Sequence, residues 1–303
     1  MAVTRVIAIT GCDSGLGWAI AARAARQGLV TVAGMYQGTE TNAAQALKKL
    51  RAHTCELDVT RPESVAGFKD YVTKLIEDNT DYKLYALVNN AGIMPTGDFE
   101  CQTWSMIENV ININLLGSMR VTSAFLPDLR RNAIDGTCRP RIINVASHCG
   151  LEPLPAFGPY SASKAGLFAW TRSLRYEHRP HGLAVAAFVP GGFVTSSNIL
   201  ASQEAYGEAM LEHLDEEQKL FYEKKIQSVT KHLRAASQNT SYDSLKDEMI
   251  IETFMKALLV DSPKEIYKVE SMWRYKIYYT LLKLPLPEAF HYWLIKKFRN
   301  FPE

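Results

Sequence analysis

The sequence predicts an α/β fold: one doubly wound parallel sheet in a single domain, with a helical lid and a C-terminal extension rich in aromatic and basic residues. Three observations support this. Short apolar runs alternate with longer helical patterns over the first two-thirds of the chain, which is typical of β-α-β units. A glycine-rich segment directly follows the first apolar run. Finally, neither an internal repeat nor a Gly/Ser/Pro-rich linker marks a second domain.

Six apolar runs are expected to form the strands: Arg5–Ile9, Val30–Met35, Thr54–Leu57, Tyr85–Asn89, Arg141–Ala146 and Ala184–Val189. Helical patterns lie between them, at Leu16–Gln27, Thr41–Leu50, Pro62–Glu77, Thr103–Arg130 and Tyr160–His178. Because crossovers between parallel strands are right-handed, these helices should cover both faces of the sheet.

The last third of the chain has a different pattern. Gln203–Arg234 is a charged helical stretch, and Ser244–Val260 is an amphipathic helix. We therefore expect a main domain over residues 1–263 that includes a substrate lid at about 196–243. Residues 264–303 form an extension that either covers the substrate cleft or lies on a membrane surface.

Composition limits the partners. The net charge of +2, from 34 basic and 32 acidic residues, gives no strong field, so nucleic acid is not expected as a partner. The five cysteines are scattered without a C-x-x-C pair, which indicates isolated thiols in a reducing compartment. The chain begins directly with a strand pattern, so we expect an intracellular protein, cytoplasmic or peripherally associated with an internal membrane, and not a secreted one. The histidines form no ligand pattern, so no metal is expected.

The glycine-rich segment has the context of a phosphate-binding loop, between an apolar strand and an alanine-rich helix. It reads Thr10-Gly11-Cys12-Asp13-Ser14-Gly15-Leu16-Gly17. Gly11 permits a tight turn, Gly15 lets the backbone approach a pyrophosphate, and Gly17 allows close packing of helix on strand. The alternative is a glycine-rich turn that binds no ligand.

A tyrosine and a lysine have the spacing of an acid–base pair. Tyr160 and Lys164 are four positions apart in a helical stretch, so their side chains emerge on one face. A free tyrosine, with a pKa of about 10, is a poor base at neutral pH. A nearby ammonium is expected to lower the pKa of Tyr160. Ser147 lies thirteen residues earlier, at the end of a predicted strand. The alternative for Tyr160 and Lys164 is an ordinary surface pair.

Taken with Asn89-Asn90-Ala91-Gly92, these motifs resemble those of the short-chain dehydrogenase/reductase superfamily. The resemblance implies a Rossmann-type fold and a catalytic tetrad of Asn114, Ser147, Tyr160 and Lys164. In it, Tyr160 is the acid–base, Ser147 orients the substrate oxygen, and Lys164 anchors the ribose and feeds a proton relay. Asn112 competes with Asn114, but the N-x-x-G spacing to Gly117 favours Asn114.

The resemblance also implies the cofactor contacts. It places Asp58 and Val59 against the adenine, the segment from Asn89 to Gly92 along the cofactor, and Thr195 on the nicotinamide carboxamide. The complete predicted set is Gly11, Asp13, Ser14, Gly15, Leu16, Gly17, Tyr36, Asp58, Val59, Asn89, Ala91, Gly92, Tyr160, Lys164, Pro190, Gly191, Phe193 and Thr195.

The choice between NAD and NADP usually depends on the residue that ends the second strand. An acid there accepts from the ribose hydroxyls and repels a 2′-phosphate, whereas a basic residue attracts the phosphate. The segment Ala33–Gly38 has neither charge, and no basic residue stands at Ser14 or near Tyr36. NAD is therefore favoured, NADP remains possible, and Gln37 or Tyr36 is a candidate contact to the ribose.

Within the superfamily, the motifs resemble a branch that contains retinol dehydrogenases, 17β- and 11β-hydroxysteroid dehydrogenases and D-β-hydroxybutyrate dehydrogenase. This implies a lipophilic alcohol or ketone as substrate, of steroid, sterol or retinoid type, and a homodimer or homotetramer. Phe221, Tyr222, Trp273 and Tyr278 are expected to supply apolar surface for that substrate.

Three questions stay open at this stage. The substrate could instead be a small hydroxy acid such as 3-hydroxybutyrate, or the protein could be a regulatory one that binds nicotinamide without catalysis. In the tail, Phe290, Leu294 and Phe298 repeat every four residues beside Lys296 and Lys297. This pattern fits a helix on a membrane interface or, equally, a helix packed over the cleft or on a neighbouring subunit.

Overall fold

A computed structural model of the chain describes residues 3–191, 198–237, 240–269, 273–282 and 284–299. In this part, seven parallel strands form one sheet in the order β3-β2-β1-β4-β5-β6-β7. The strands are β1 (Thr4–Ile9), β2 (Val30–Met35), β3 (His53–Glu56), β4 (Tyr82–Asn89), β5 (Arg141–Val145), β6 (Ala184–Val189) and β7 (Ile266–Lys268). The order reverses between β1 and β4, and this is where an open α/β sheet binds its ligands.

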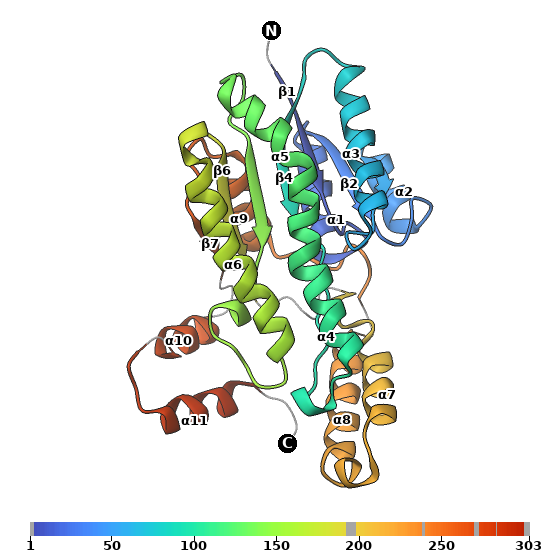
Figure 1. Cartoon of the computed structure of the whole chain (residues 1–303), viewed down its shortest axis with the longest axis vertical. Coiled ribbons are helices and arrows are strands. Elements are labelled where there is room, and N and C mark those ends of the chain that lie inside the picture. Colours follow the sequence, from blue (N-terminus) through green and yellow to red (C-terminus); the bar gives the residue numbers. More distant parts are fainter. Residues whose placement is uncertain (1–2, 192–197, 238–239, 270–272, 283, 300–303) are drawn as a thin grey trace.

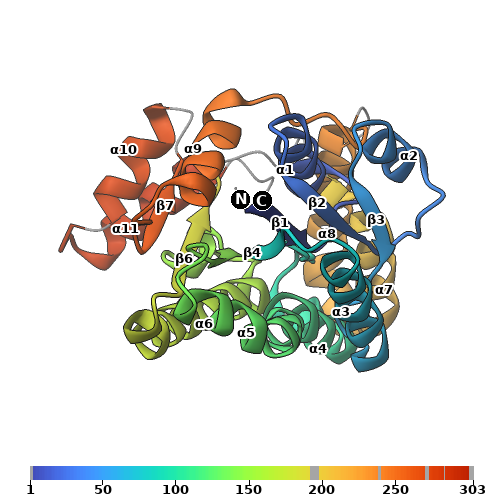
Figure 2. The ribbon, with the colours of Figure 1, turned by 90° about the horizontal axis from the view of Figure 1, so that it is seen from above.

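Helices cover both faces of the sheet, as predicted for a doubly wound fold (Figure 2). One face carries α1 (Gly15–Arg26), α2 (Asn42–Lys49) and α9 (Glu248–Leu259). The other face carries α3 (Pro62–Glu77), α4 (Trp104–Ile111), α5 (Ser118–Ile134) and α6 (Gly158–His178). The strands are buried on both sides, so each face of the sheet packs against its own layer of helices. These two layers form separate apolar clusters.

The six predicted strands are confirmed with small shifts at their ends, but β7 was not predicted. It has only three residues, Ile266–Lys268, and forms because β6 offers an edge to pair with. The stretch 103–130, predicted as one helix, is interrupted by a π-helical segment at Asn112–Gly117. There Gly117 lies so close to Val59 that an added Cβ would be 2.6 Å from its Cγ2.

The lid and the tail both lie at the carboxyl edge of the sheet (Figure 1). The lid is a helix pair, α7 (Gln203–His213) and α8 (Glu216–Ser237), which was predicted as a single stretch. The break is made by a reciprocal cap, in which Asp215 accepts from the Gln218 N–H and Gln218 accepts from the Asp215 N–H. The tail forms α10 (Trp273–Leu282) and α11 (Glu288–Arg299). Among the described helices, none is long and apolar enough to span a bilayer.

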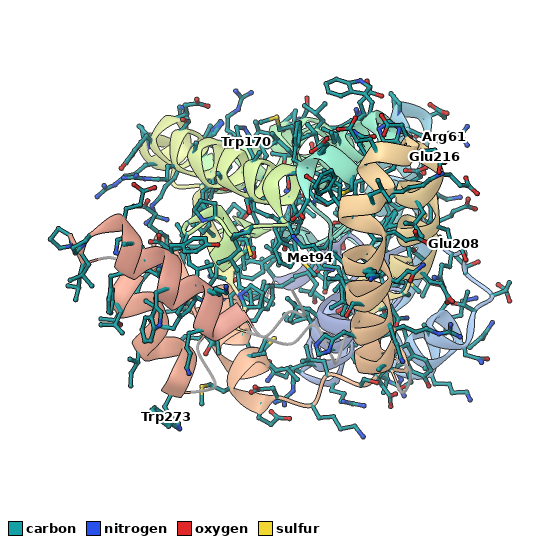
Figure 3. All side chains as sticks on the ribbon, turned by 90° about the horizontal axis from the view of Figure 1, so that it is seen from below. Arg61, Met94, Trp170, Glu208, Glu216 and Trp273 are labelled. Carbon is teal, nitrogen blue, oxygen red and sulfur yellow. The ribbon has the colours of Figure 1, made fainter. Side chains whose placement is uncertain are left out.

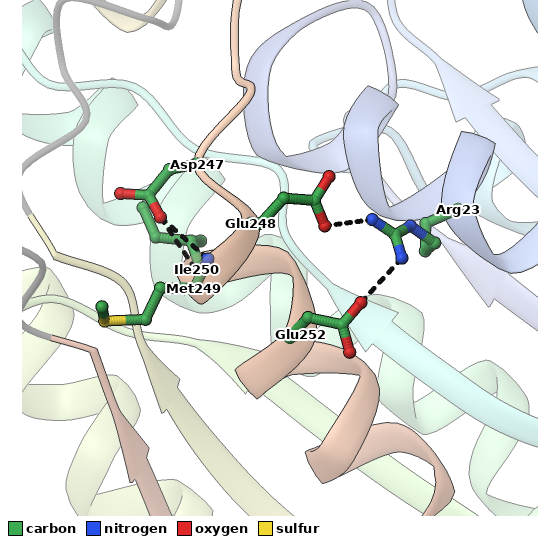
Figure 4. Close-up of polar contacts among 6 residues, drawn as sticks. All are labelled: Arg23, Asp247, Glu248, Met249, Ile250 and Glu252. Atoms are coloured by element: carbon green, nitrogen blue, oxygen red, sulfur yellow. Dashed lines mark hydrogen bonds and ion pairs between the residues drawn. The ribbon is translucent and has the colours of Figure 1, made fainter.

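Helix α9 is tied to α1 near its N-terminus by a surface ion-pair cluster (Figure 4). Arg23 contacts both Glu248 and Glu252, the latter at 2.7 Å. Asp247 caps the helix by accepting from the N–H groups of Met249 and Ile250. Because both glutamates are largely exposed, the ion pairs orient the helix more than they stabilise the fold.

The C-terminal end of α9 is held by an aromatic–cation stack whose Tyr85 and Arg141 are buried and whose Arg5 is exposed. The Tyr85 ring lies between the guanidinium groups of Arg5 and Arg141, at 4.5 and 4.7 Å from its centroid. The Tyr85 hydroxyl donates to the Leu258 carbonyl at 2.8 Å. Arg141 donates to the carbonyls of Ala257 and Val260, so its charge also faces the negative end of the helix dipole.

We expect Tyr85→Phe to lower the free energy of unfolding by about 1–2 kcal/mol, because it leaves the buried Leu258 carbonyl without its donor. Tyr71→Phe is the matched control, since its hydroxyl contacts His53 at the surface and its loss should cost less than about 0.5 kcal/mol. Urea unfolding of both variants measures the difference. Equal losses would contradict the importance of the buried bond.

Candidate active site

The structure brings the four predicted catalytic residues together at the carboxyl edge of the sheet. Ser147 follows β5, while Tyr160 and Lys164 lie on adjacent turns near the start of α6. The Ser147 hydroxyl accepts from the Cys149 N–H and is hydrogen-bonded to the Tyr160 phenol. Lys164 Nζ donates to the Val145 carbonyl at 2.9 Å and lies 5.9 Å from the centre of the Tyr160 ring.

Asn114 sits in the π-helical segment, where its buried side chain joins three elements. Its Oδ1 accepts from the Ile93 N–H, and its Nδ2 donates to the Ile93 carbonyl and to Ser163 Oγ. Ser163 in turn donates to the Tyr160 carbonyl at 2.7 Å. Asn112, the competing residue, instead accepts from Arg120. The geometry therefore places Asn114, and not Asn112, beside the tyrosine and lysine.

Burial dominates the titration of the two central groups. It raises the pKa of Tyr160 far above its ordinary value, the nearby Cys149 adds to the rise, and the hydrogen bond from Ser147 opposes it. Burial also lowers the pKa of Lys164 to about 8. Lys164 was expected to lower the pKa of Tyr160, but the protein groups alone do not lower it. The ammonium of Lys164 points to the Val145 carbonyl, and desolvation of the phenol outweighs any effect of that ammonium.

The glycine loop has the shape that a dinucleotide requires. Gly11 has φ +67°, and a Cβ there would lie 2.8 Å from the Ala91 Cα; a Cβ on Gly17 would lie 2.1 Å from the Gly11 carbonyl oxygen. The N–H groups of Leu16 and Gly17 belong to the first turn of α1, which has no partners for them within the helix. The Gly15 N–H donates to the Tyr242 carbonyl at 3.1 Å. The loop thus offers amides and a helix N-terminus to a pyrophosphate.

The other predicted cofactor residues divide into two groups. Gly92 lies beside Asn114 and Lys164, Pro190 and Gly191 directly follow β6, and Val59 lies in the middle of the loop after β3, against Gly117. These positions border the same edge of the sheet.

Asn89 and Asp58, in contrast, use their side chains within the protein. Asn89 is buried and donates to Thr122 and Asn144, which ties β4 to β5 and α5. The Asp58 carboxylate accepts from the N–H and hydroxyl of Thr60 and so caps the turn before α3. Two further predicted contacts, Phe193 and Thr195, lie outside the described residues.

Asp13 has a position that the sequence did not reveal. One carboxylate oxygen accepts from the Tyr36 N–H and the other from the Gln37 N–H, each at 2.9 Å. These are the first two residues after β2, so a negative charge stands where the sequence of that strand has none. The expectation of an uncharged strand end therefore needs correction. Asp13 was predicted as a cofactor contact from its place in the glycine loop, but the spacing along the chain does not reveal that its carboxylate lies at the end of β2.

An apolar wall surrounds Tyr160 on the lid side. Met94 lies near the centre of the view in Figure 3, between the lid and α6. The residues that pack in this cluster with Tyr160 are Met94, Val110, Phe157, Leu200, Val229 and Leu233. Gln203 holds the start of α7 to the loop after β4 through both the N–H and the carbonyl of Thr96.

Two of the four aromatic residues expected to supply this surface face solvent instead. Phe221 and Trp273 are 74% and 71% exposed, and Trp273 projects from the outer edge of the tail (Figure 3). Tyr222 donates to Glu100, and Tyr278 packs with Leu282 and Leu294 inside the tail. The expectation is wrong for Phe221 and Trp273, because composition shows that these helices are amphipathic but not which face of each turns inward.

Comparison with known proteins identifies the family. A model of the short chain dehydrogenase family matches residues 5–205, and the chain belongs to this family. It is 30% identical to the mitochondrial D-beta-hydroxybutyrate dehydrogenase of Bos taurus, over 78% of this chain and 71% of that protein. It is 32% identical to retinol dehydrogenase 16 of Homo sapiens, over 96% of this chain and 88% of that protein.

Two further comparisons agree with these. Estradiol 17-beta-dehydrogenase 2 of Mus musculus is 34% identical over 70% of this chain and 53% of that protein. A short chain dehydrogenase/reductase from Burkholderia phymatum, solved in complex with NAD, has a TM-score of 0.67 at 20% identity, with 88% and 89% of the two chains covered. The predicted resemblance to this branch and the Rossmann-type fold are confirmed.

Replacing Lys164 by methionine should raise the free energy of unfolding at pH 7 by about 1–3 kcal/mol, because the buried ammonium is replaced by an apolar chain. The folded-state pKa of Lys164 lies below its ordinary value of 10.5. The folded wild type is therefore penalised below about pH 8, and it regains stability as the pH rises towards 10.5.

The advantage of Lys164→Met over wild type should accordingly shrink across that pH range. Urea titrations of both proteins at several pH values measure it, and other titrating groups cancel in the difference. A constant advantage at all pH values would contradict the lowered pKa.

Proposed function

We propose that the protein is an NAD(P)-dependent oxidoreductase that interconverts a lipophilic alcohol of steroid, sterol or retinoid type and its carbonyl form. The observation that carries the proposal is the placement of Tyr160 between Ser147 and Lys164, at the edge of the sheet that also carries the glycine loop. The family membership supports the reaction class, and the apolar cluster around Tyr160 supports a lipophilic substrate.

In this mechanism Tyr160 takes the hydroxyl proton of the alcohol, and Ser147 holds the same oxygen by a hydrogen bond. The glycine loop and Lys164 would hold the nicotinamide dinucleotide. When bound in its oxidised form it would take up the hydride of the carbinol carbon, and the positive charge of its ring would lower the pKa of Tyr160, which the protein groups alone do not do. Lys164 binds the ribose hydroxyls and passes the proton onward, with Asn114 beside it. Carbonyl reduction follows the same steps in reverse.

A small hydroxy acid such as 3-hydroxybutyrate is the second candidate substrate, favoured by the similarity to D-beta-hydroxybutyrate dehydrogenase. Such a substrate needs a cation to hold its carboxylate. Lys225 of the lid is already engaged by Asp98, and the cluster around Tyr160 is apolar. These contacts favour the lipophilic alcohol.

We expect Tyr160→Phe to lower kcat by about a hundredfold or more, because the acid–base group is lost while the ring is kept. Tyr176→Phe on the same helix is the matched control and should keep wild-type turnover, since that ring is 58% exposed. Turnover is followed by nicotinamide absorbance with a panel of steroids, retinol and 3-hydroxybutyrate, each with NAD and NADP. Full activity of Tyr160→Phe would refute the mechanism, and activity on 3-hydroxybutyrate alone would favour the second candidate.

We also propose that the tail contacts a membrane surface. Trp273, Tyr292 and Trp293 are 71%, 65% and 53% exposed on α10 and α11, and such rings favour the lipid–water interface. The exposed face of α11 differs from the face that the four-residue repeat predicted for membrane contact, because Leu294 of that repeat is buried against Tyr278 and Leu282. The exposed aromatic rings, and not Leu294, form the proposed contact.

Changing Trp273, Tyr292 and Trp293 together to serine should therefore reduce sedimentation with phosphatidylcholine–phosphatidylserine vesicles by about tenfold. The control changes Phe99, Trp104 and Phe221 to serine, since these are similarly exposed but lie on or beside the lid. Because all six side chains are exposed, neither variant should unfold the protein. If the tail variant sediments with the vesicles as wild type does, the membrane proposal is refuted.

A further inference from the structure

We propose that Asp13 makes the protein select NAD over NADP, although it is not part of the strand that usually carries this determinant. The inference rests on the proposed function, since it concerns the same cofactor site. It is carried by the position of the Asp13 carboxylate, which accepts from the N–H groups of Tyr36 and Gln37 at 2.9 Å each.

The position matters because β2 ends at Met35, immediately before these two residues. In Rossmann-type folds an acidic residue at this strand end accepts from the ribose hydroxyls, and its charge opposes a phosphate on the 2′ position. In this chain the acid reaches the same place from the glycine loop, three residues after Thr10. The loop thus supplies both the amides for the pyrophosphate and the charge beside the ribose.

The carboxylate is fixed, and among the residues that the structure describes no basic side chain is paired with it to neutralise its charge. Both of its hydrogen-bond partners are backbone amides, which carry no net charge, and each carboxylate oxygen has a second lone pair that is open to a ribose hydroxyl. Asp13 is only partly buried, so a cofactor can reach it. The charge of Asp13 also acts on the neighbouring thiol: burial raises the pKa of Cys12, and Asp13 raises it further.

The other acid close to this strand end in the sequence, Glu40, is differently placed. It is 80% exposed at its side chain and is paired with Lys48 at 3.0 Å. Because that pairing offsets its charge in open solvent, Glu40 should have little influence on a bound phosphate. It therefore offers a matched control that removes one negative charge from the same region.

The test is the binding of NAD and NADP, measured by calorimetry without turnover, for wild type, Asp13→Asn and Glu40→Gln. Wild type should bind NAD more tightly, and Asp13→Asn should shift the ratio of the two dissociation constants towards NADP by about tenfold or more. Glu40→Gln should keep the ratio within about twofold of wild type. A ratio unchanged by Asp13→Asn would overturn the inference.

A second measurement uses wild type alone, because Asp13→Asn could also disturb the structure of the glycine loop. Salt screens the repulsion between Asp13 and a 2′-phosphate, so raising the salt concentration should move the wild-type ratio towards NADP. A salt-independent wild-type ratio would overturn the inference without any variant. Failure of the proposed function looks different, because it would appear as absent turnover on every substrate, whereas the ratio of the two dissociation constants is measured without turnover.

Discussion

The candidate active site depends on the contact between the loops that follow β1 and β4. The Thr10 hydroxyl accepts from the N–H groups of Asn90 and Ala91, and the Asn90 side chain donates to the carbonyls of Thr10 and Gly11. These four bonds close the point where the strand order reverses. Because Gly11 and Gly17 have no room for a side chain there, the contact fixes the start of α1 relative to Gly92 and the residues beyond it.

Buried polar groups at this same edge of the sheet lower the stability of the fold. Lys164 is buried with a lowered pKa, its ammonium is held by one main-chain carbonyl, and the buried phenol of Tyr160 stands next to it. An arrangement of this kind is unfavourable for folding but is typical of a catalytic site, where groups are held ready for a charged partner. The stack of Tyr85 and Arg141 at the opposite edge, where α9 ends, contributes stability without taking part in the site.

Much of the fold was predictable because it is encoded locally. The buried strands are continuous apolar runs, and the glycine loop and the Tyr160–Lys164 spacing are short patterns with fixed geometry. What could not be predicted depends on contacts between distant segments. The strand β7 exists only through its pairing with β6, and the charge at the end of β2 comes from Asp13, 22 residues before Met35. The inward face of the lid is set by packing, so the exposed Phe221 was misplaced.

The lid is joined to both halves of the site. At its start, Gln203 binds the main chain of Thr96 in the loop after β4. Just after its end, the Tyr242 carbonyl accepts from the Gly15 N–H, and the Tyr242 ring lies 5.0 Å from that of Trp18 on α1. The helix pair beside Tyr160 is thus attached to the glycine loop after β1. Any large movement of this helix pair must strain or break these attachments, so its position and the shape of the glycine loop are physically linked.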